Sequence, residues 1–365
     1  MSTFNSTNQI PERILIILFG AIGDVVRGIS LATRIKRHAP KSHITWAVER
    51  TSSSLVLSHH SIDKVIIFDK KKGIRGYLSF MKELRSTNFD VCLDLSRHLK
   101  GGITSLFSGS KYRIGFARKN SREGNWLFQN EHIQEVEHFS DKIYHYQKFA
   151  DAINVPSEDK IDFELVPLDS ELKRVEEILI SASRDSEVSV PSPDKRVLFF
   201  IGSTWESREW PSSHYANLAL ALFRELGMSS IIIGAGSDKK RALEIMSEAK
   251  SLYSLSSLPF SVIDLTGKSN LVDLKALAHV SRIAVGSDSG PMHIASATGL
   301  PVISLWGPTN PMRSTPYGNL KNALQSPVGC APCYLKKCPG LGGICLSGIT
   351  PDVVMIKVKT LVSAE

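Results

Sequence analysis

The chain has 365 residues, which is long enough for two domains that each bury a core of their own. Hydrophobic residues make up 42% and charged residues 22%, proportions that exclude a disordered, collagen-like or coiled-coil protein. The net charge is +8, and residues 1–167 hold 24 basic against 18 acidic side chains. This excess favours an anionic partner, although a solvated basic surface has the same composition.

The start of the chain does not have the pattern of an export signal. Residues 1–11 are polar, and the first apolar run, Ile14–Ile22, is too short to span a membrane. Five cysteines, an odd number, make a disulfide framework unexpected. We therefore expect a protein of the reducing cytosol.

The first half predicts a parallel sheet wrapped by helices. Arg13–Phe19 is typical of a buried strand, and after a glycine-containing turn Val25, Ile29 and Ala32 recur on one helical face. This alternation of strand and helix indicates an α/β fold. It continues with strands near Ile44–Val48, Val65–Phe68 and Val91–Leu93 and a helix near Tyr77–Arg85.

A second series follows Ser181–Lys195, a polar segment that we interpret as a loop near the domain junction. We expect domains at 1–167 and 168–348, both doubly wound and Rossmann-like. Residues 349–365 predict a last helix, with Thr350 as its N-cap and Pro351 at its first position, which returns to the first domain. The second series has strands at Val197–Ile201, Ser230–Ile233, Ile263–Leu265, Ile283–Val285 and Val302–Leu305, and helices that begin at Pro211 and Asp238.

The first predicted strand-to-helix turn contains Gly20, Gly23 and Asp24. Glycines let a ligand approach the backbone. The spacing is Gly-x-x-Gly rather than the Gly-x-Gly-x-x-Gly of dinucleotide sites, and an acid stands where a pyrophosphate would bind. Asp24 is therefore either a helix-capping carboxylate or a general base at the end of a strand, and the residues alone favour neither role.

A second turn has the composition of an anion site. Gly286 ends a predicted strand, and Asp288, Ser289 and Gly290 lead into a helix that includes His293. The unpaired backbone N–H groups at such a helix start can bind a diphosphate. A well-capped turn without a ligand has the same composition.

With these motifs the chain resembles glycosyltransferase family 9, the ADP-heptose:lipopolysaccharide heptosyltransferases. The resemblance covers most of the chain and implies a GT-B architecture, in which two Rossmann-like domains face a central cleft. The first domain would bind the acceptor and the second the nucleotide sugar. The motifs are Gly23–Val26, Ser203-Thr204 with Arg208–Pro211, Gly234–Asp238, and Asp288–His293 continuing into Leu305–Pro311.

The resemblance also implies roles for single residues. Asp24 matches the catalytic base, which takes the proton of the acceptor hydroxyl. Arg208 stands where the family usually has Lys and would hold the leaving diphosphate, whereas Leu18 stands where many members have Lys or Arg, so one cation near the base is missing. Asp238 would accept a hydrogen bond from the ribose. The other implied donor-binding residues are Ser203, Thr204, Asp288, Ser289, Gly290 and His293.

The chemistry itself requires a base on one face of the sugar and stabilised negative charge on the other. The sequence has no Asp-x-Asp motif, which holds a metal-bound diphosphate in other glycosyltransferases. Arg208 and a helix N-terminus would replace that metal. We therefore expect a metal-independent inverting transfer that requires no cofactor, with an ADP-sugar as the donor substrate.

Residues 95–122 contain seven basic side chains and no acid. Such a segment suits the phosphates and carboxylates of an inner-core lipid, although a solvated face or a nucleic-acid site has the same composition. The resemblance places the acceptor near Lys100 and Arg122, and Arg97 is a third candidate.

Four of the five cysteines lie close together near the end of the chain. Their spacing could close a tetrahedral zinc site. Free thiols and a disulfide are the alternatives, and no catalytic role follows from the pattern. The four residues are Cys330, Cys333, Cys338 and Cys345.

We therefore expect an inverting glycosyltransferase that moves a heptose or related sugar from an ADP-sugar to lipopolysaccharide inner core or a similar glycolipid, with Asp24 as general base. It would be cytoplasmic and peripheral at the inner membrane, where the basic half meets anionic lipid, and would bind no nucleic acid. The alternatives are a relative that uses another nucleotide sugar and acceptor, and a noncatalytic nucleotide-sugar-binding protein. The missing Gly-x-Gly-x-x-Gly disfavours an NAD-dependent oxidoreductase.

Overall fold

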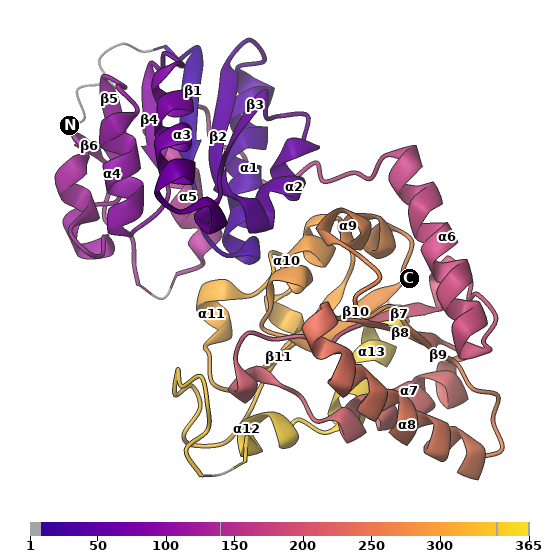
Figure 1. Ribbon diagram of the computed structural model, residues 1–365. Helices are drawn as coiled ribbons and strands as arrows, with labels where there is room; N and C mark the ends of the chain where they lie inside the picture. Colours follow the sequence, from indigo (N-terminus) through magenta and orange to yellow (C-terminus); the bar gives the residue numbers. More distant parts are fainter. Residues whose placement is uncertain (1–8, 139, 341, 364–365) are drawn as a thin grey trace. The chain divides into compact units, whose positions relative to one another are not determined.

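The computed structural model describes residues 9–138, 140–340 and 342–363. It divides into two compact units, Met1–Glu164 and Leu165–Glu365 (Figure 1). The sequence placed this boundary at residue 167. In the described residues each unit contains one six-stranded sheet with parallel pairing throughout, flanked by helices, which confirms the expected α/β class.

The first unit is built on a sheet of order β3-β2-β1-β4-β5-β6. Its central strand is β1, in which Ile14–Ile17 are fully buried, as expected for a parallel strand covered on both faces. Helix α1 packs against α5, and α3 packs beside α4. Right-handed crossovers place these two pairs on opposite faces of the sheet. The strands are β1 (Arg13–Ile17), β2 (His43–Glu49), β3 (Lys64–Phe68), β4 (Val91–Asp94), β5 (Tyr112–Gly115) and β6 (Glu131–His132); the helices are α1 (Ile22–His38), α2 (Ser53–Leu57), α3 (Gly73–Arg85), α4 (Leu99–Phe107) and α5 (Lys142–Asp151).

The second unit repeats this plan with the order β12-β11-β10-β7-β8-β9. Its strands are β7 (Arg196–Phe200), β8 (Ser229–Ile233), β9 (Val262–Asp264), β10 (Ile283–Ser287), β11 (Val302–Trp306) and β12 (Ala323–Gln325). Its helices are α6 (Asp169–Ser186), α7 (Ser212–Leu226), α8 (Lys239–Leu255), α9 (Leu271–His279), α10 (Gly290–Ala297), α11 (Pro311–Ser314), α12 (Ile344–Ser347) and α13 (Pro351–Val362).

The strand orders determine where each unit can bind a ligand. In the first unit the chain runs outward from β1 to β3 and then returns to β4 on the other side of β1; in the second it does the same from β7 to β9 and β10. Ligands of open parallel sheets bind at this reversal, at the carboxyl edge where the strands end. The expected sites are therefore the ends of β1 and β4 and the ends of β7 and β10.

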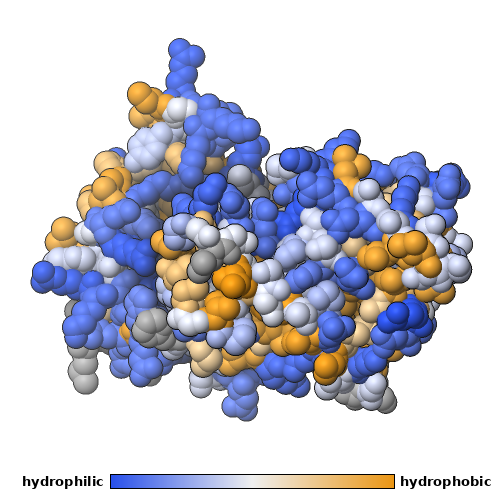
Figure 2. Space-filling model, turned by 90° about the horizontal axis from the view of Figure 1, so that it is seen from below, coloured by the Kyte–Doolittle hydropathy of each residue, from blue (hydrophilic) through white to orange (hydrophobic). Residues whose placement is uncertain are grey.

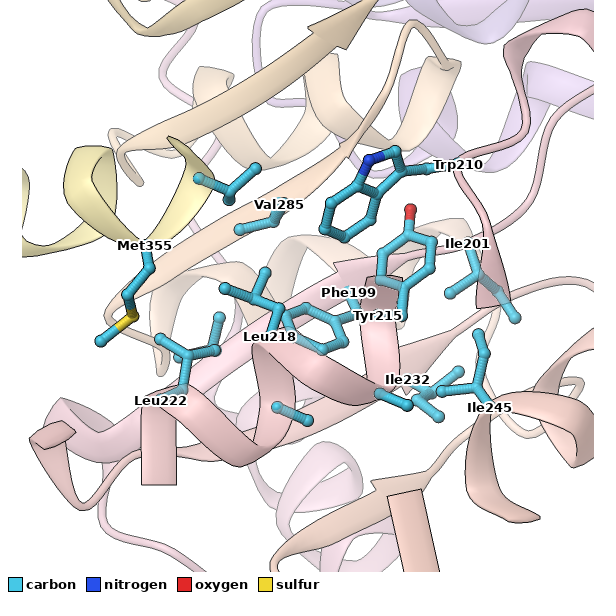
Figure 3. Packing of buried hydrophobic residues seen from close by; sticks show 14 of the residues in the cluster. Phe199, Ile201, Trp210, Tyr215, Leu218, Leu222, Ile232, Ile245, Val285 and Met355 are labelled. Atoms are coloured by element: carbon cyan, nitrogen blue, oxygen red, sulfur yellow. The ribbon is translucent and has the colours of Figure 1, made fainter. Parts of the chain in front are cut away.

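Aromatic packing anchors the core of the second unit (Figure 3). Trp210 meets Tyr215 edge to face at 4.7 Å, and its indole N–H donates to the Ile349 carbonyl at 2.7 Å. The buried residues Val354, Met355 and Val358 of α13 belong to the same cluster.

Helix α13 begins as expected, with Thr350 at the N-cap and Pro351 in the first turn. It packs on α7 and belongs to the second unit. The return of residues 349–365 to the first domain stays a prediction, and the structure shows that one face of α13 is buried beside α7.

The polar segment Ser181–Lys195 is also not a simple loop. Its first residues complete α6, which ends at Ser186, and Val175, Leu179 and Ala182 are the buried face of that helix. The Ser-rich composition of its last turn hid this periodicity.

The face shown in Figure 2 is mostly hydrophilic, and its hydrophobic side chains form separate small groups. Among the described residues, none of the helices is both long enough and apolar enough to cross a membrane.

Candidate active site

Asp24 lies at the carboxyl edge of the first sheet, in the first turn of α1. The turn from β1 is tight, because a Cβ on Gly20 would lie 3.1 Å from the Asp24 Cβ. Arg27 Nη1 and Lys142 Nζ lie 3.0 and 3.1 Å from Asp24 Oδ1. The side chain is 23% exposed. The carboxylate is therefore held by two cations and is still reachable from solvent.

Lys142 supplies a cation that the local motif lacks. Leu18 is buried in the first unit, as an apolar side chain should be. Lys142, at the start of α5, approaches Asp24 from another part of the chain. Sequence reasoning missed this contact because nothing near Asp24 in the sequence indicates it.

A second carboxylate belongs to the same cluster. Asp141 caps α5 by accepting from the Ile143 N–H at 3.1 Å. Burial raises the pKa of Asp141, and the nearby charges of Arg27 and Lys142 act in the opposite direction. Two carboxylates, Asp24 and Asp141, and two cations, Arg27 and Lys142, thus lie together at this end of β1.

The structure brings two of the three predicted acceptor-binding residues together. The Arg122 N–H donates to the Arg97 carbonyl at 2.7 Å, and the Arg122 side chain is exposed. The Arg97 guanidinium stacks 4.3 Å from the Phe116 ring centre and lies 2.7 Å from His145 Nδ1. These two cations come from loops after β4 and β5.

Lys100 has a different environment. Its ammonium group pairs with Glu49 and lies 4.1 and 4.4 Å from the ring centres of Phe19 and Phe68. Burial lowers the pKa of Lys100, and Glu49 opposes this. Lys100 therefore lies beside the β1 turn but already has an anionic partner.

Asp94 is a buried carboxylate that sequence reasoning missed. It ends β4, next to β1, and accepts from Ser96 N and Oγ at 2.9 and 2.7 Å, from Asn125 Nδ2 at 2.7 Å and from Gln129 Nε2 at 2.9 Å. Burial raises its pKa to about 7. Asp94 thereby ties the loop that carries Arg97 to the segment that follows Arg122. A carboxylate directly after the predicted strand Val91–Leu93 was the available signal.

In the second unit, Arg208 and Asp288 meet at the reversal between β7 and β10. Arg208 Nη1 lies 3.2 Å from Asp288 Oδ2 and donates to the Asp288 carbonyl at 3.3 Å. The guanidinium stacks 3.9 Å from the centre of the Trp205 ring, and Asp288 also accepts from the Thr309 hydroxyl at 3.0 Å. Burial lowers the pKa of Arg208, and Asp288 opposes this.

Two buried polar atoms beside this pair lack a partner within the described part of the chain. They are Arg208 Nε and the hydroxyl of Ser289. Ser289 is the N-cap of α10, whose first residue is Gly290, and its side chain makes no capping bond. Buried polar groups are normally satisfied. An anion at the start of α10 would satisfy both donors and the helix N–H groups.

Asp238 lies on the β8 side of the same edge. Its Oδ2 accepts from the Ala235 N–H at 2.7 Å. A Cβ on Gly202 or Gly234 would collide with the Asp238 side chain, so both strand ends need glycine there. Ser203 Oγ accepts from the Trp205 N–H at 3.2 Å, Thr204 is exposed and His293 is buried in α10. The eight predicted donor residues thus all follow β7, β8 or β10.

The cysteines show no metal site. Cys345 is buried under Gly307, and burial raises its pKa, with the other three thiols acting in the same direction. Cys330 and Cys333 are exposed, and Cys338 is half-buried. Among the described residues, no group of three or more His, Cys, Asp or Glu side chains could hold a metal ion. The structure therefore gives no support to the predicted zinc site.

Comparisons with known proteins agree with these motifs. The model of glycosyltransferase family 9 (heptosyltransferase) matches residues 77–342. The lipopolysaccharide core heptosyltransferase OpsX of Haemophilus influenzae is 32% identical over 317 residues, which are 87% of this chain and 85% of that protein. Lipopolysaccharide heptosyltransferase 1 of Pseudomonas aeruginosa is 23% identical over 338 residues, 89% of this chain and 87% of that protein.

Solved structures show the same fold. The ADP-heptose lps heptosyltransferase II of Escherichia coli matches with a TM-score of 0.72 at 20% identity, over 96% of this chain and 98% of that one. Escherichia coli heptosyltransferase WaaC with ADP matches with a TM-score of 0.71 at 20% identity, over 96% and 99%. The two Rossmann-like units expected from the sequence are thus of the GT-B type.

Proposed function

Since the chain belongs to glycosyltransferase family 9, a family of heptosyltransferases, we propose that it transfers a heptose or related sugar from an ADP-sugar to lipopolysaccharide inner core or a similar glycolipid. The chain is a glycosyltransferase. The observation that carries the proposal is the group formed by Arg208, Asp288 and Ser289, where unsatisfied donors meet a helix start.

The donor diphosphate binds at this group. Arg208 and the N–H groups of the first turn of α10 stabilise the charge that develops on the leaving diphosphate. Asp238, at the adjacent strand end, accepts from the ribose hydroxyls. A relative in the same family was solved with ADP, which supports an adenosine nucleotide.

Asp24 acts as the general base. The acceptor oxygen attacks the anomeric carbon while Asp24 takes its proton, and the bond from that carbon to the diphosphate oxygen breaks with its electron pair on the diphosphate. Attack opposite the leaving group inverts the anomeric centre. Arg27 and Lys142, both within about 3 Å of Asp24 Oδ1, fix the orientation of the carboxylate.

The acceptor is an anionic glycolipid. Arg97 and Arg122, joined through their backbones at the carboxyl edge of the first sheet, bind its phosphates or carboxylates, and Lys100 lies beside the β1 turn. Such an acceptor lies in a membrane, so the enzyme works as a peripheral protein at the cytoplasmic face of the inner membrane.

Arg208 and α10 supply the positive charge that a metal ion would otherwise bring to the diphosphate. Transfer therefore proceeds without a metal or cofactor, and a chelator leaves the rate unchanged. A rate that falls with chelator and recovers with a divalent ion contradicts this part of the proposal.

The test is transfer by the purified chain from ADP-heptose to a truncated core lipid, with the product followed by mass spectrometry. Asp24→Asn should lower the rate by about 10³-fold or more, because the base is lost, while ADP affinity changes little. Asp159→Asn, at an exposed site of the same unit, is the matched control. Product from another nucleotide sugar alone would reassign the donor, and ADP binding without any transfer would favour a noncatalytic binding protein.

A further inference from the structure

Helix α3 of the first unit carries large apolar side chains on its solvent face. Ile74 is 80% exposed and Leu78, one turn later, is 62% exposed. The buried residues of the same helix, Phe80, Met81 and Leu84, face the sheet. Ile74 and Leu78 are therefore not part of the core, and they lie one turn apart on the exposed side of the helix.

The surroundings of these two side chains are strongly basic. Residues 70–85 contain six Lys or Arg side chains and one acid, Glu83. Lys71, Lys72 and Arg75 are all exposed. Together with Ile74 and Leu78 they form what we call the α3 surface. Apolar side chains among cations are typical of protein segments that lie on anionic membranes.

The α3 surface lies at the same edge of the sheet as the acceptor residues. The short helix Lys70–Lys72 and α3 follow β3, and α4 follows β4, so both start where the parallel strands end. Glu49 connects the residues before α3 to the first turn of α4 by two ion pairs. Lys70 lies 2.8 Å from its Oε2, and Lys100 pairs with its Oε1. Helix α3 also packs beside α4 (Figure 1).

We propose that the α3 surface docks on an anionic lipid bilayer, with Ile74 and Leu78 inserted among the acyl chains and Lys71, Lys72 and Arg75 at the lipid phosphates. The argument for membrane binding depends on these five residues alone. The purpose of the binding rests on the proposed function, because docking at this edge brings Arg97 and Arg122 to the level of the headgroups, where a glycolipid presents its anionic sugars. The excess of cations favours an anionic bilayer over an apolar protein partner, because such a protein would not require positive charge around the apolar side chains.

The experiment is flotation of the full chain with phosphatidylcholine vesicles that contain or lack phosphatidylglycerol. The chain should float only with the anionic vesicles and dissociate as salt rises. Each lost cation should weaken binding about fivefold, so Lys71→Gln, Lys72→Gln and Arg75→Gln together should weaken it about a hundredfold. Ile74→Ser with Leu78→Ser should weaken it by about tenfold or more.

Matched controls come from the second unit. Lys173→Gln, Lys240→Gln and Lys321→Gln remove the same charge from exposed positions. Leu243→Ser with Leu255→Ser removes exposed apolar side chains of α8, which are 59% and 82% exposed. Both control sets should float like the unmodified chain.

Three results overturn the proposal: no flotation of the unmodified chain, equal flotation with neutral vesicles, or α3 variants that float as well as the controls. A dimer in sedimentation that Ile74→Ser with Leu78→Ser dissociates would assign the surface to a second copy instead. Transfer to a soluble acceptor without acyl chains separates the two proposals. The α3 variants should retain this transfer, because it requires no membrane. If the unmodified chain shows no such transfer, the result counts against the proposed function alone.

Discussion

Lys142 Nζ lies 3.1 Å from Asp24 Oδ1, although the two residues are 118 positions apart in the chain. Helix α5 returns to α1 at this point, so the orientation of the carboxylate depends on how two helices pack. Arg27, one turn after Asp24, binds the same oxygen at 3.0 Å.

Removing the Lys142 ammonium should slow transfer. We expect Lys142→Ala to lower kcat by about ten- to a hundredfold, because Asp24, the proposed base, would lose its alignment with the acceptor hydroxyl. ADP affinity should not change, since the residues proposed to bind ADP lie in the other unit. Steady-state kinetics and calorimetry with ADP measure the two effects.

Lys142→Arg keeps the charge and should recover much of the rate. Lys148→Ala removes an exposed lysine from the same helix and serves as the control. If Lys142→Arg is as slow as Lys142→Ala, the charge at Asp24 is not what positions it.

A second prediction concerns the planar guanidinium of Arg208. It bonds Asp288 and stacks on Trp205 at once, and a lysine ammonium cannot do both. Arg208→Lys should lower kcat/KM for the donor by about tenfold, and Arg208→Gln by about 10²- to 10³-fold, because the charge is also lost. Arg224→Lys, at an exposed site, should behave as the unmodified enzyme. Equal activity of the Lys and Gln variants would exclude a role for the charge.

The buried carboxylate of Asp94 should make the stability of the first unit depend on pH. Its pKa is about 7 in the folded state against 3.8 for an ordinary Asp, so the folded state binds the proton more tightly. The stability gained from the protonated form is present at low pH and is lost as pH rises from about 4 through 7. The loss should be on the order of a few kcal/mol.

Asp94→Asn mimics the protonated side chain and should flatten this dependence. Hydrogen exchange of the β4 amides at pH 5 and pH 8 measures the stability of the first unit in both proteins. The prediction fails if the two proteins lose equal protection between these pH values.

Gly101 explains how closely α4 approaches Asp94. A Cβ at this position would collide with Ser96 Oγ and lie 2.6 Å from Asp94 Oδ1. Gly101→Ala should therefore destabilise the first unit by about 2 kcal/mol, although alanine favours helix. Gly329→Ala, which meets open space, should change stability by less than about 0.5 kcal/mol. Denaturant unfolding compares the two, and equal midpoints would contradict the steric argument.

The sequence predicted those parts of the fold whose apolar pattern is continuous. Strands formed close to Ile44–Val48 and Val302–Leu305 because parallel strands buried on both faces read as unbroken apolar runs. The sequence did not predict β6 and β12, because these strands have only two and three residues. It did not predict α6, because the last turn of that helix is rich in Ser. Short or polar elements are held by their neighbours rather than by their own pattern.

The candidate site divides in the same way. Motifs located Asp24 and Asp288, because each follows a buried strand at a sheet edge. Lys142, which also holds Asp24, is 118 positions away in the chain, and no local pattern connects the two residues. The Asp94 network joins residues on separate segments, so only the folded chain reveals it.

The burial of α13 also has a consequence for the second unit as a whole. Val354, Met355 and Val358 each contribute about 2 kcal/mol to the core around α7, and their sum approaches the whole stability of a typical domain. Deleting the 12 residues of α13 would thus remove a small part of the second unit and still unfold all of it.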